Sequence, residues 1–179
     1  MTRLFTAFTL LLLAAVAAPA QAAEPLVDAA WVDAHKADPN VVVLDIRNKI
    51  DGGSADAYRE GHIPGAVYSN YLDDGWRVAH EGVPGYLPPV ADLEKLIGGL
   101  GIGNDTHVVI VAGGVSSTDM GSATRIYWTF KVLGHDEVSI LNGGQRAYAE
   151  SYDLEEGWNE RCGRNCWPRP TRWRRITRR

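Results

Sequence analysis

The sequence predicts an α/β fold, a parallel sheet with helices on both faces, in a single domain. Three short segments, residues 41–44, 107–111 and 138–141, are apolar or β-branched at nearly every position, which is typical of strands buried on both faces. Segments with the apolar spacing of helices lie between these strands, and this alternation predicts a helix-covered parallel sheet. A chain of 179 residues is long enough for one such domain.

Two of the helical segments carry a single apolar stripe, with apolar residues three and four positions apart. The stripes are Leu93, Leu96, Ile97 and Leu100, and then Ala123, Ile126, Tyr127, Phe130 and Leu133. Further helices are expected at residues 29–37, with Asp28 as the N-cap, at residues 54–60, and after Gly143-Gly144. Residues 67–71 are a further candidate strand, and residues 73–89, with several Gly and Pro, are expected to form a long loop.

Residues 1–23 predict a secretory signal peptide. Arg3 supplies a positive charge, residues 4–16 are almost entirely apolar, and Ala20-Gln21-Ala22 places small residues where a signal peptidase cuts. The alternative is an uncleaved anchor, but the apolar run is shorter than the ~20 residues of a spanning helix. We expect cleavage after Ala22 or Ala23 and no stable membrane anchor afterwards. The mature protein would be exported, to the periplasm if the source is bacterial.

The charges divide the mature chain into an acidic body and a basic tail, residues 157–179. The formal net charge is −4, from 18 basic and 22 acidic residues. Residues 159–179 hold eight Arg and one Glu, and without them and Arg3 the chain has 9 basic and 21 acidic residues, a net charge of −12. The tail lacks apolar periodicity and is expected to be disordered. Basic tails often bind anionic partners, but an exported protein rarely meets nucleic acid, so we expect no nucleic-acid partner.

Ligands of open parallel sheets bind beyond the carboxyl ends of the strands, so the loops there hold the candidate site residues. After residues 41–44 come Asp45 and Arg47, which could bind an anion together or pair with each other. We favour the pairing role for Asp45 and leave Arg47 open. His62 lies before a Pro-Gly turn and could titrate near neutral pH, but we favour a hydrogen bond to a backbone carbonyl that fixes the turn.

Four motifs occur in an order and spacing similar to those of rhodanese (sulfurtransferase) domains. They are VVVLDIR at residues 41–47, YREGHIPGAV at 58–67, VVIVAGG with GSATRIYW at 108–128, and LGHDEVSILNGG at 133–144. The resemblance covers residues 26–156 and is closest to the N-terminal domains of two-domain thiosulfate and 3-mercaptopyruvate sulfurtransferases. It departs at Ser69, where the family usually has an aliphatic or aromatic residue. We therefore expect a rhodanese-like domain at residues 24–156.

The resemblance also implies what this domain lacks. In catalytic rhodanese domains a Cys follows the strand that corresponds to residues 107–111, and loop N–H groups surround its sulfur. Here that position is Ala112, and no Cys occurs before Gly121. Ser116, Ser117 and Thr118 have hydroxyls, but an alcohol carries no transferable sulfane sulfur, and Asp119 would repel an incoming anion. Related phosphatases need the same Cys followed by an Arg, and neither is present.

The same family pattern suggests a partner. N-terminal domains of two-domain sulfurtransferases have lost their Cys, and a second domain performs the chemistry, so a catalytic rhodanese domain is an expected partner. The residues expected to face an anion or the inter-domain cleft are Arg47, His62, Ser116, Ser117 and Arg125. The resemblance stops after residue 156, which suggests a chain cut short, for example by a shifted reading frame. The alternative is a non-catalytic rhodanese-like module that docks a partner protein.

The two cysteines lie in the basic tail and do not restore the missing thiol. Cys162 and Cys166 have C-x3-C spacing without a nearby His, which makes a poor zinc site. In an exported protein we expect the pair to form a disulfide. We expect no metal and no cofactor.

Overall fold

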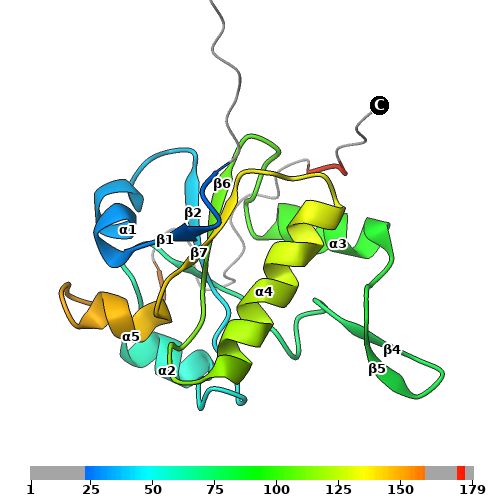
Figure 1. Ribbon diagram of the computed structural model, residues 1–179, viewed down its shortest axis with the longest axis horizontal. Coiled ribbons are helices and arrows are strands. Elements are labelled where there is room, and N and C mark those ends of the chain that lie inside the picture. The colour runs from blue at the N-terminus through cyan, green and yellow to red at the C-terminus, as the bar shows by residue number, and fades with distance from the viewer. Residues whose placement is uncertain (1–22, 160–172, 176–179) are drawn as a thin grey trace, which may run out of the picture.

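The computed structural model describes residues 23–159 and 173–175. Five parallel strands form the central sheet in the order β1 (Leu26–Val27), β7 (Val138–Leu141), β6 (His107–Val111), β2 (Val41–Asp45) and β3 (Val67–Tyr68) (Figure 1). The three strands predicted from apolar runs are neighbours within it, so the predicted parallel α/β fold is confirmed. The predicted signal peptide lies outside the described residues except for Ala23, and so do Cys162 and Cys166.

Helices cover both faces of the sheet (Figure 1). The helices α1 (Ala29–His35), α2 (Ala55–Glu60) and α5 (Gly144–Ala149) lie on one face, and α3 (Val90–Gly99) and α4 (Ser117–Val132) on the other. Alternate residues of β6 supply the two cores: Val108 and Ile110 pack with the second group of helices, and Val109 and Val111 with the first. This alternation follows from the two-residue repeat of a strand.

The helix ends agree with the capping residues in the sequence. Asp28 caps α1 by accepting the Trp31 N–H at 2.7 Å, and Ser54 caps α2 by accepting the Ala57 N–H at 3.1 Å. The first helix ends at His35, two residues before the predicted end, and the second begins one residue after Ser54. Both differences are confined to the helix ends, where the sequence is least informative.

The expectation of a plain loop at residues 73–89 is wrong, because an antiparallel hairpin forms within it. Its strands are β4 (Val78–His80) and β5 (Val83–Tyr86). The two-residue turn between them is Glu81-Gly82, and both residues have positive φ, 50° and 79°. A turn of this kind normally has Asn or Asp before the Gly. Because Glu81 stands there instead, the sequence does not indicate the turn.

The stretch before the hairpin is fixed to the body by a buried tryptophan. Trp76 is fully buried, and its Nε1–H donates to Ser69 Oγ at 2.9 Å. Ser69 Oγ in turn donates to Asp74 Oδ2 at 3.0 Å. The polar residue at position 69, where the family usually has an apolar one, therefore bonds the indole that fills this part of the core.

Residues 157–159 and 173–175, the described parts of the predicted basic tail, pack onto the body. The Gly157 N–H donates to Arg59 O at 2.7 Å, and Asn159 Nδ2 donates to Ala66 O at 3.0 Å. Further along, Trp173 is 3% exposed and belongs to the core on the α3–α4 side of the sheet. The large apolar area of an indole favours such burial, and the absence of apolar periodicity around it conceals this. Within the part of the chain that the structure describes, no helix has the length and apolarity needed to cross a membrane.

Candidate functional site

The loops after β6 and β7 meet at the carboxyl edge of the sheet. Ala112 follows directly after β6, and its carbonyl accepts the Gln145 N–H from α5 at 2.8 Å. The loops approach so closely that a Cβ on Gly114 would lie 1.9 Å from the Gly143 oxygen. They line a pocket of about 370 Å³ together with the first turn of α4. Ala112, which the resemblance predicts to correspond to the family's Cys, lies at the carboxyl end of β6 and has a methyl side chain.

The Ala112 loop, residues 112–120, wraps its N–H groups around the carboxylate of Asp119. Oδ2 accepts from Gly114 at 2.7 Å and from Val115 at 2.9 Å, and Oδ1 accepts from Ser116 at 3.1 Å and from Met120 at 2.9 Å. Converging backbone N–H groups at a helix N-terminus are a typical anion-binding cradle. In this chain an internal carboxylate fills that cradle.

The environment keeps Asp119 ionised. The side chain is buried, which by itself raises the pKa of the carboxyl group, but the hydrogen bonds from Val115, Ser116, Gly114 and Met120 outweigh burial and hold the pKa below its ordinary value. Hydrogen bonds donated to a carboxylate favour its charged form. Asp119 therefore places a negative charge in the cradle, where a second anion would have to bind.

A second carboxylate occupies the beginning of the same loop. Asp51 Oδ2 accepts the Gly113 N–H at 3.2 Å, while its Oδ1 accepts the N–H groups of Asn48 and Gly53 at 2.9 and 3.0 Å. The four consecutive N–H groups of residues 113–116 thus all donate to carboxylates. Asp51 was not predicted as a site residue, although the Asp-Gly-Gly sequence at residues 51–53 indicates a turn.

The hydroxyls of the loop take part in helix capping or lie at the surface. Ser116 Oγ accepts from the N–H groups of Thr118 at 3.2 Å and Asp119 at 3.4 Å, and with Asp119 it forms a capping box. Ser117, the first residue of α4, is exposed. Ser116 is therefore the N-cap of α4 and is bonded to Asp119.

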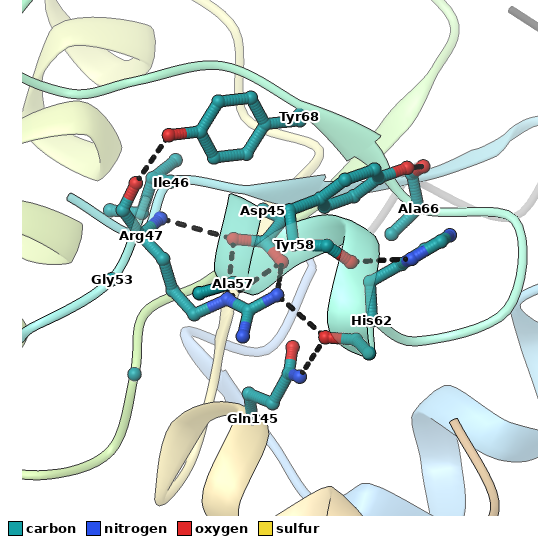
Figure 2. Close-up of polar contacts among 12 residues, drawn as sticks. Asp45, Ile46, Arg47, Gly53, Ala57, Tyr58, His62, Ala66, Tyr68 and Gln145 are labelled. Atoms are coloured by element: carbon teal, nitrogen blue, oxygen red, sulfur yellow. Dashed lines mark hydrogen bonds and ion pairs between the residues drawn. The ribbon is translucent and has the colours of Figure 1, made fainter. Parts of the chain in front are cut away.

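Arg47 and Asp45 form a buried ion pair at the carboxyl end of β2 (Figure 2). Arg47 Nε and Nη2 donate to the Asp45 carboxylate at 2.8–3.1 Å, and Nη2 also donates to Gly61 O at 2.9 Å. Burial raises the pKa of Asp45, and the Arg47 charge opposes that shift. Gln145 Nε2 donates to the same Gly61 oxygen at 2.7 Å, so the pair is connected through Gln145 to the Ala112 loop. No pattern in the sequence indicates this role for Gln145.

His62 is fully buried and serves the turn in which it lies. Its Nδ1–H donates to Tyr58 O at 3.0 Å, and its ring stacks on that of Tyr58 with centroids 3.9 Å apart (Figure 2). His62 and Glu155 exchange backbone hydrogen bonds of 3.0 and 2.8 Å, and His62 Nε2 lies 3.7 Å from Glu155 Oε2. Burial lowers the pKa of His62. The residues after Tyr152 thus cover this histidine.

Arg125 points toward the hairpin and away from the Ala112 loop. Its Nη2 donates to Gly85 O of β5 at 2.7 Å, and its guanidinium lies 4.8 Å from the centre of the Trp128 ring. Of the five residues predicted to face an anion or a cleft, Ser116 lies beside the pocket and Ser117 begins the adjacent helix. Arg47, His62 and Arg125 bond to groups outside the Ala112 loop, as described above. Among the described residues, no three His, Cys, Asp or Glu side chains gather as a metal site would require.

This chain is similar to known proteins in both sequence and fold. Residues 28–151 match the Rhodanese-like domain family. A thiosulfate sulfurtransferase of Bos taurus is 38% identical over 141 residues, which are 74% of this chain and 43% of that protein. A mitochondrial thiosulfate/3-mercaptopyruvate sulfurtransferase of Arabidopsis thaliana is 32% identical, over 74% of this chain and 34% of its own length. The chain thus spans less than half the length of these two relatives.

The solved structures of similar fold include one bacterial and one protozoan enzyme. SseA from Escherichia coli, a 3-mercaptopyruvate sulfotransferase with the rhodanese fold, matches with a TM-score of 0.60 at 28% identity, over 75% of this chain and 52% of its own. The 3-mercaptopyruvate sulfurtransferase of Leishmania major gives a TM-score of 0.65 at 21% identity, over 89% and 43%, which supports the fold. With the family match over residues 28–151, these findings place the chain in the Rhodanese-like domain family.

Proposed function

We propose that this chain is the non-catalytic N-terminal domain of a thiosulfate/3-mercaptopyruvate-type sulfurtransferase and that it does not transfer sulfur by itself. The observation that carries the proposal is the Asp119 carboxylate in the cradle that begins at Ala112. Sulfur transfer in this fold needs a thiolate that takes up a sulfane sulfur as a persulfide. Here the side chain at that position is a methyl group, and an internal anion binds the surrounding donors.

The electrostatics of the loop support the same conclusion. A persulfide or an incoming thiosulfate is anionic and gains stabilisation from N–H groups aimed at it. The four N–H groups of residues 113–116 already donate to Asp51 and Asp119. An anion at this place would meet two negative charges and would have to displace one of them.

The relatives suggest how such a domain takes part in sulfur transfer. Both sulfurtransferases described above extend well beyond the region shared with this chain. We propose that a catalytic rhodanese domain is its partner. Val115 and Met120 of the Ala112 loop are 56% and 37% exposed, and such apolar side chains at the rim of a pocket are suited to being covered by another protein surface.

A non-catalytic binding or regulatory module is the second candidate. The observation that favours it is the packing of Trp173 into the core, because a segment beyond the family region that docks on the domain is what a self-standing module would show. Both candidates share the absence of catalysis. They differ in whether a second rhodanese domain completes an active enzyme with this one.

An activity measurement tests the absence of catalysis. The purified chain is assayed for sulfur transfer from thiosulfate and from 3-mercaptopyruvate to cyanide, beside a variant with Cys162→Ser and Cys166→Ser. We expect equal rates for both proteins, no higher than that of free cysteine at the same concentration, because the Ala112 loop contains no Cys. Turnover at an enzymatic rate that persists in the double variant would disprove the proposal.

A further inference from the structure

Trp173 packs onto the body at the opposite end of the sheet from the Ala112 loop. Trp173 is buried in the core formed with α3 and α4, and its ring centre lies 6.3 Å from that of His135. His135 is itself buried and bonded through Nε2 to Thr106 O at 2.9 Å, just before β6 begins. The indole therefore packs at the amino-terminal end of β6, where the candidate functional site does not extend.

The two residues after Trp173 are held through their backbone. Asn104 Nδ2 donates to Arg174 O at 2.7 Å, and Asn104 Oδ1 accepts the Arg174 N–H at 3.2 Å. Glu94 Oε1 of α3 accepts the Arg175 N–H at 2.9 Å. One carboxamide that bonds both the N–H and the C=O of a residue acts as a neighbouring strand would. These two bonds hold the backbone of Arg174 and involve no atom of its side chain.

These contacts define what the site can recognise. The aromatic ring is the part that is buried, while the side chains of Arg174 and Arg175 are exposed. Both following residues must have an N–H group to donate, which excludes proline. The acidic body, of net charge −12, attracts a basic segment of net charge +7 at long range. The recognised pattern is a Trp followed by two non-proline residues within a basic segment.

We propose that this surface, the Trp173 site, is a peptide-binding site of the domain, made by His135, Asn104, Glu94 and the adjoining core. Its occupant is residues 173–175 of the chain itself, which fill it within one molecule. The same segment supplied from outside can fill it when the internal copy is withdrawn. The Trp173 site is distinct from the Ala112 loop, and the inference stands whether or not the domain has a catalytic partner.

Binding of a labelled peptide to the full chain tests the proposal. The probe is a fluorescent synthetic peptide with the sequence of residues 168–179, measured by anisotropy against the wild-type chain and the Trp173→Ala chain. We expect binding to the variant, and an apparent affinity at least about tenfold weaker for the wild type, because its own tethered segment competes at an effective concentration near millimolar. No binding to a folded Trp173→Ala chain would overturn the proposal.

Changes in the peptide separate specific recognition from charge attraction. Replacing its Trp by Ala removes the buried anchor and should weaken binding to the Trp173→Ala chain at least about tenfold. Replacing the following Arg by N-methylarginine, which removes one N–H donor and keeps the charge of the peptide, should weaken it several-fold. Equal affinity of all three peptides would show attraction by charge alone and would overturn the proposal.

Changes in the chain locate the site and guard against a variant that does not fold. Adding Asn104→Ala to Trp173→Ala should weaken peptide binding about 30-fold, since two hydrogen bonds are lost at a combined cost of about 2 kcal/mol. Asn142→Ala, an exposed Asn at the opposite edge of the sheet, is the matched control and should leave binding unchanged. If Trp173→Ala unfolds the chain, Asn104→Ala alone is compared with wild type, and we expect faster trypsin cleavage after Arg174. An unchanged cleavage rate would then overturn the proposal.

Discussion

At the scale of single residues, Asp119 determines what the Ala112 loop can do. Its carboxylate accepts four backbone N–H groups, and hydrogen bonds to an ionised acceptor contribute more than those between neutral groups. The same side chain completes the capping box of α4. Asp119 therefore stabilises the loop and the start of the helix while it keeps the cradle closed to other anions.

Asp119→Asn should destabilise the fold by about 1–3 kcal/mol, because an amide offers one acceptor oxygen in place of two and turns an NH₂ group toward N–H donors. The pKa of Asp119 is lowered in the folded state, so its stabilisation is present above the unfolded-state pKa of about 4 and is lost as the pH falls through the folded-state value. Urea unfolding should therefore show a difference between wild type and variant at pH 7 that shrinks below pH 4. Asp73→Asn, at an exposed position, is the control, and an equal loss in both variants would contradict the role of Asp119.

Ala112→Cys places a thiol at the family position beside an occupied cradle. We expect this thiol to titrate at or above the ordinary value of about 8.5, because the Asp119 anion disfavours a neighbouring thiolate. In Ala112→Cys with Asp119→Asn the negative charge is gone, and the thiol should titrate about one pH unit lower. The pH dependence of alkylation by iodoacetamide measures both values in proteins that also carry Cys162→Ser and Cys166→Ser. The same titration in both would show that Asp119 has no influence on position 112.

The sequence predicted part of this site for a physical reason. The position of Ala112 at the edge of the sheet follows from the apolar strand before it, and the Asp45–Arg47 pair and the hydrogen bond from His62 to a carbonyl were among the alternatives considered. The spacing of Ser116 and Asp119 is a capping-box pattern, which could have predicted the bond from the Ser116 N–H. The bonds from Gly114 and Val115 depend on the orientation of the loop backbone, which no side-chain pattern encodes. Asp119 was expected to repel an incoming anion. In the structure its carboxylate occupies the place where such an anion would bind.

At the scale of elements, regular apolar patterns were informative and short polar ones were not. The stripes on α3 and α4 predicted their buried faces, including Leu93, Ile97 and Phe130. The hairpin β4–β5 was missed because its strands contain Pro84 and Gly85 and its turn begins with Glu81. The edge strand β1 was also missed, since two residues cannot establish an alternating pattern.

The hairpin depends on α4 for its position. An isolated two-stranded hairpin is marginally stable in water, and the Arg125 bond to Gly85 O ties it to the body. Arg125→Met should therefore increase amide hydrogen exchange in residues 78–86 several-fold and leave exchange in β6 unchanged. Arg146→Met, on the exposed side of α5, is the matched control. Unchanged exchange in the hairpin of the Arg125 variant would mean that other contacts hold it.

At the scale of the whole molecule, both ends of the described chain join the same fold. Near the amino terminus the carbonyl of Pro25 accepts the Ile140 N–H at 2.9 Å, and that of Glu24 accepts the Ser139 hydroxyl at 2.5 Å. Near the other end Trp173 enters the core on the α3–α4 side. The sheet edge at β1 thus begins within a few residues of the proposed cleavage site.

Cleavage after Ala22 or Ala23 should leave this edge complete, because the first residue whose backbone bonds to β7 is Glu24. Cleavage beyond Pro25 would remove the acceptor of the Ile140 N–H and leave a buried donor without its partner, at a cost of about 1–3 kcal/mol. We therefore expect the exported protein to show by mass spectrometry a new amino terminus at Ala23 or Glu24. A variant with Leu in place of both Ala20 and Ala22 should stay uncleaved, because a signal peptidase needs small residues there. An intact amino terminus on the exported wild-type protein would contradict the assignment of a signal peptide to residues 1–23.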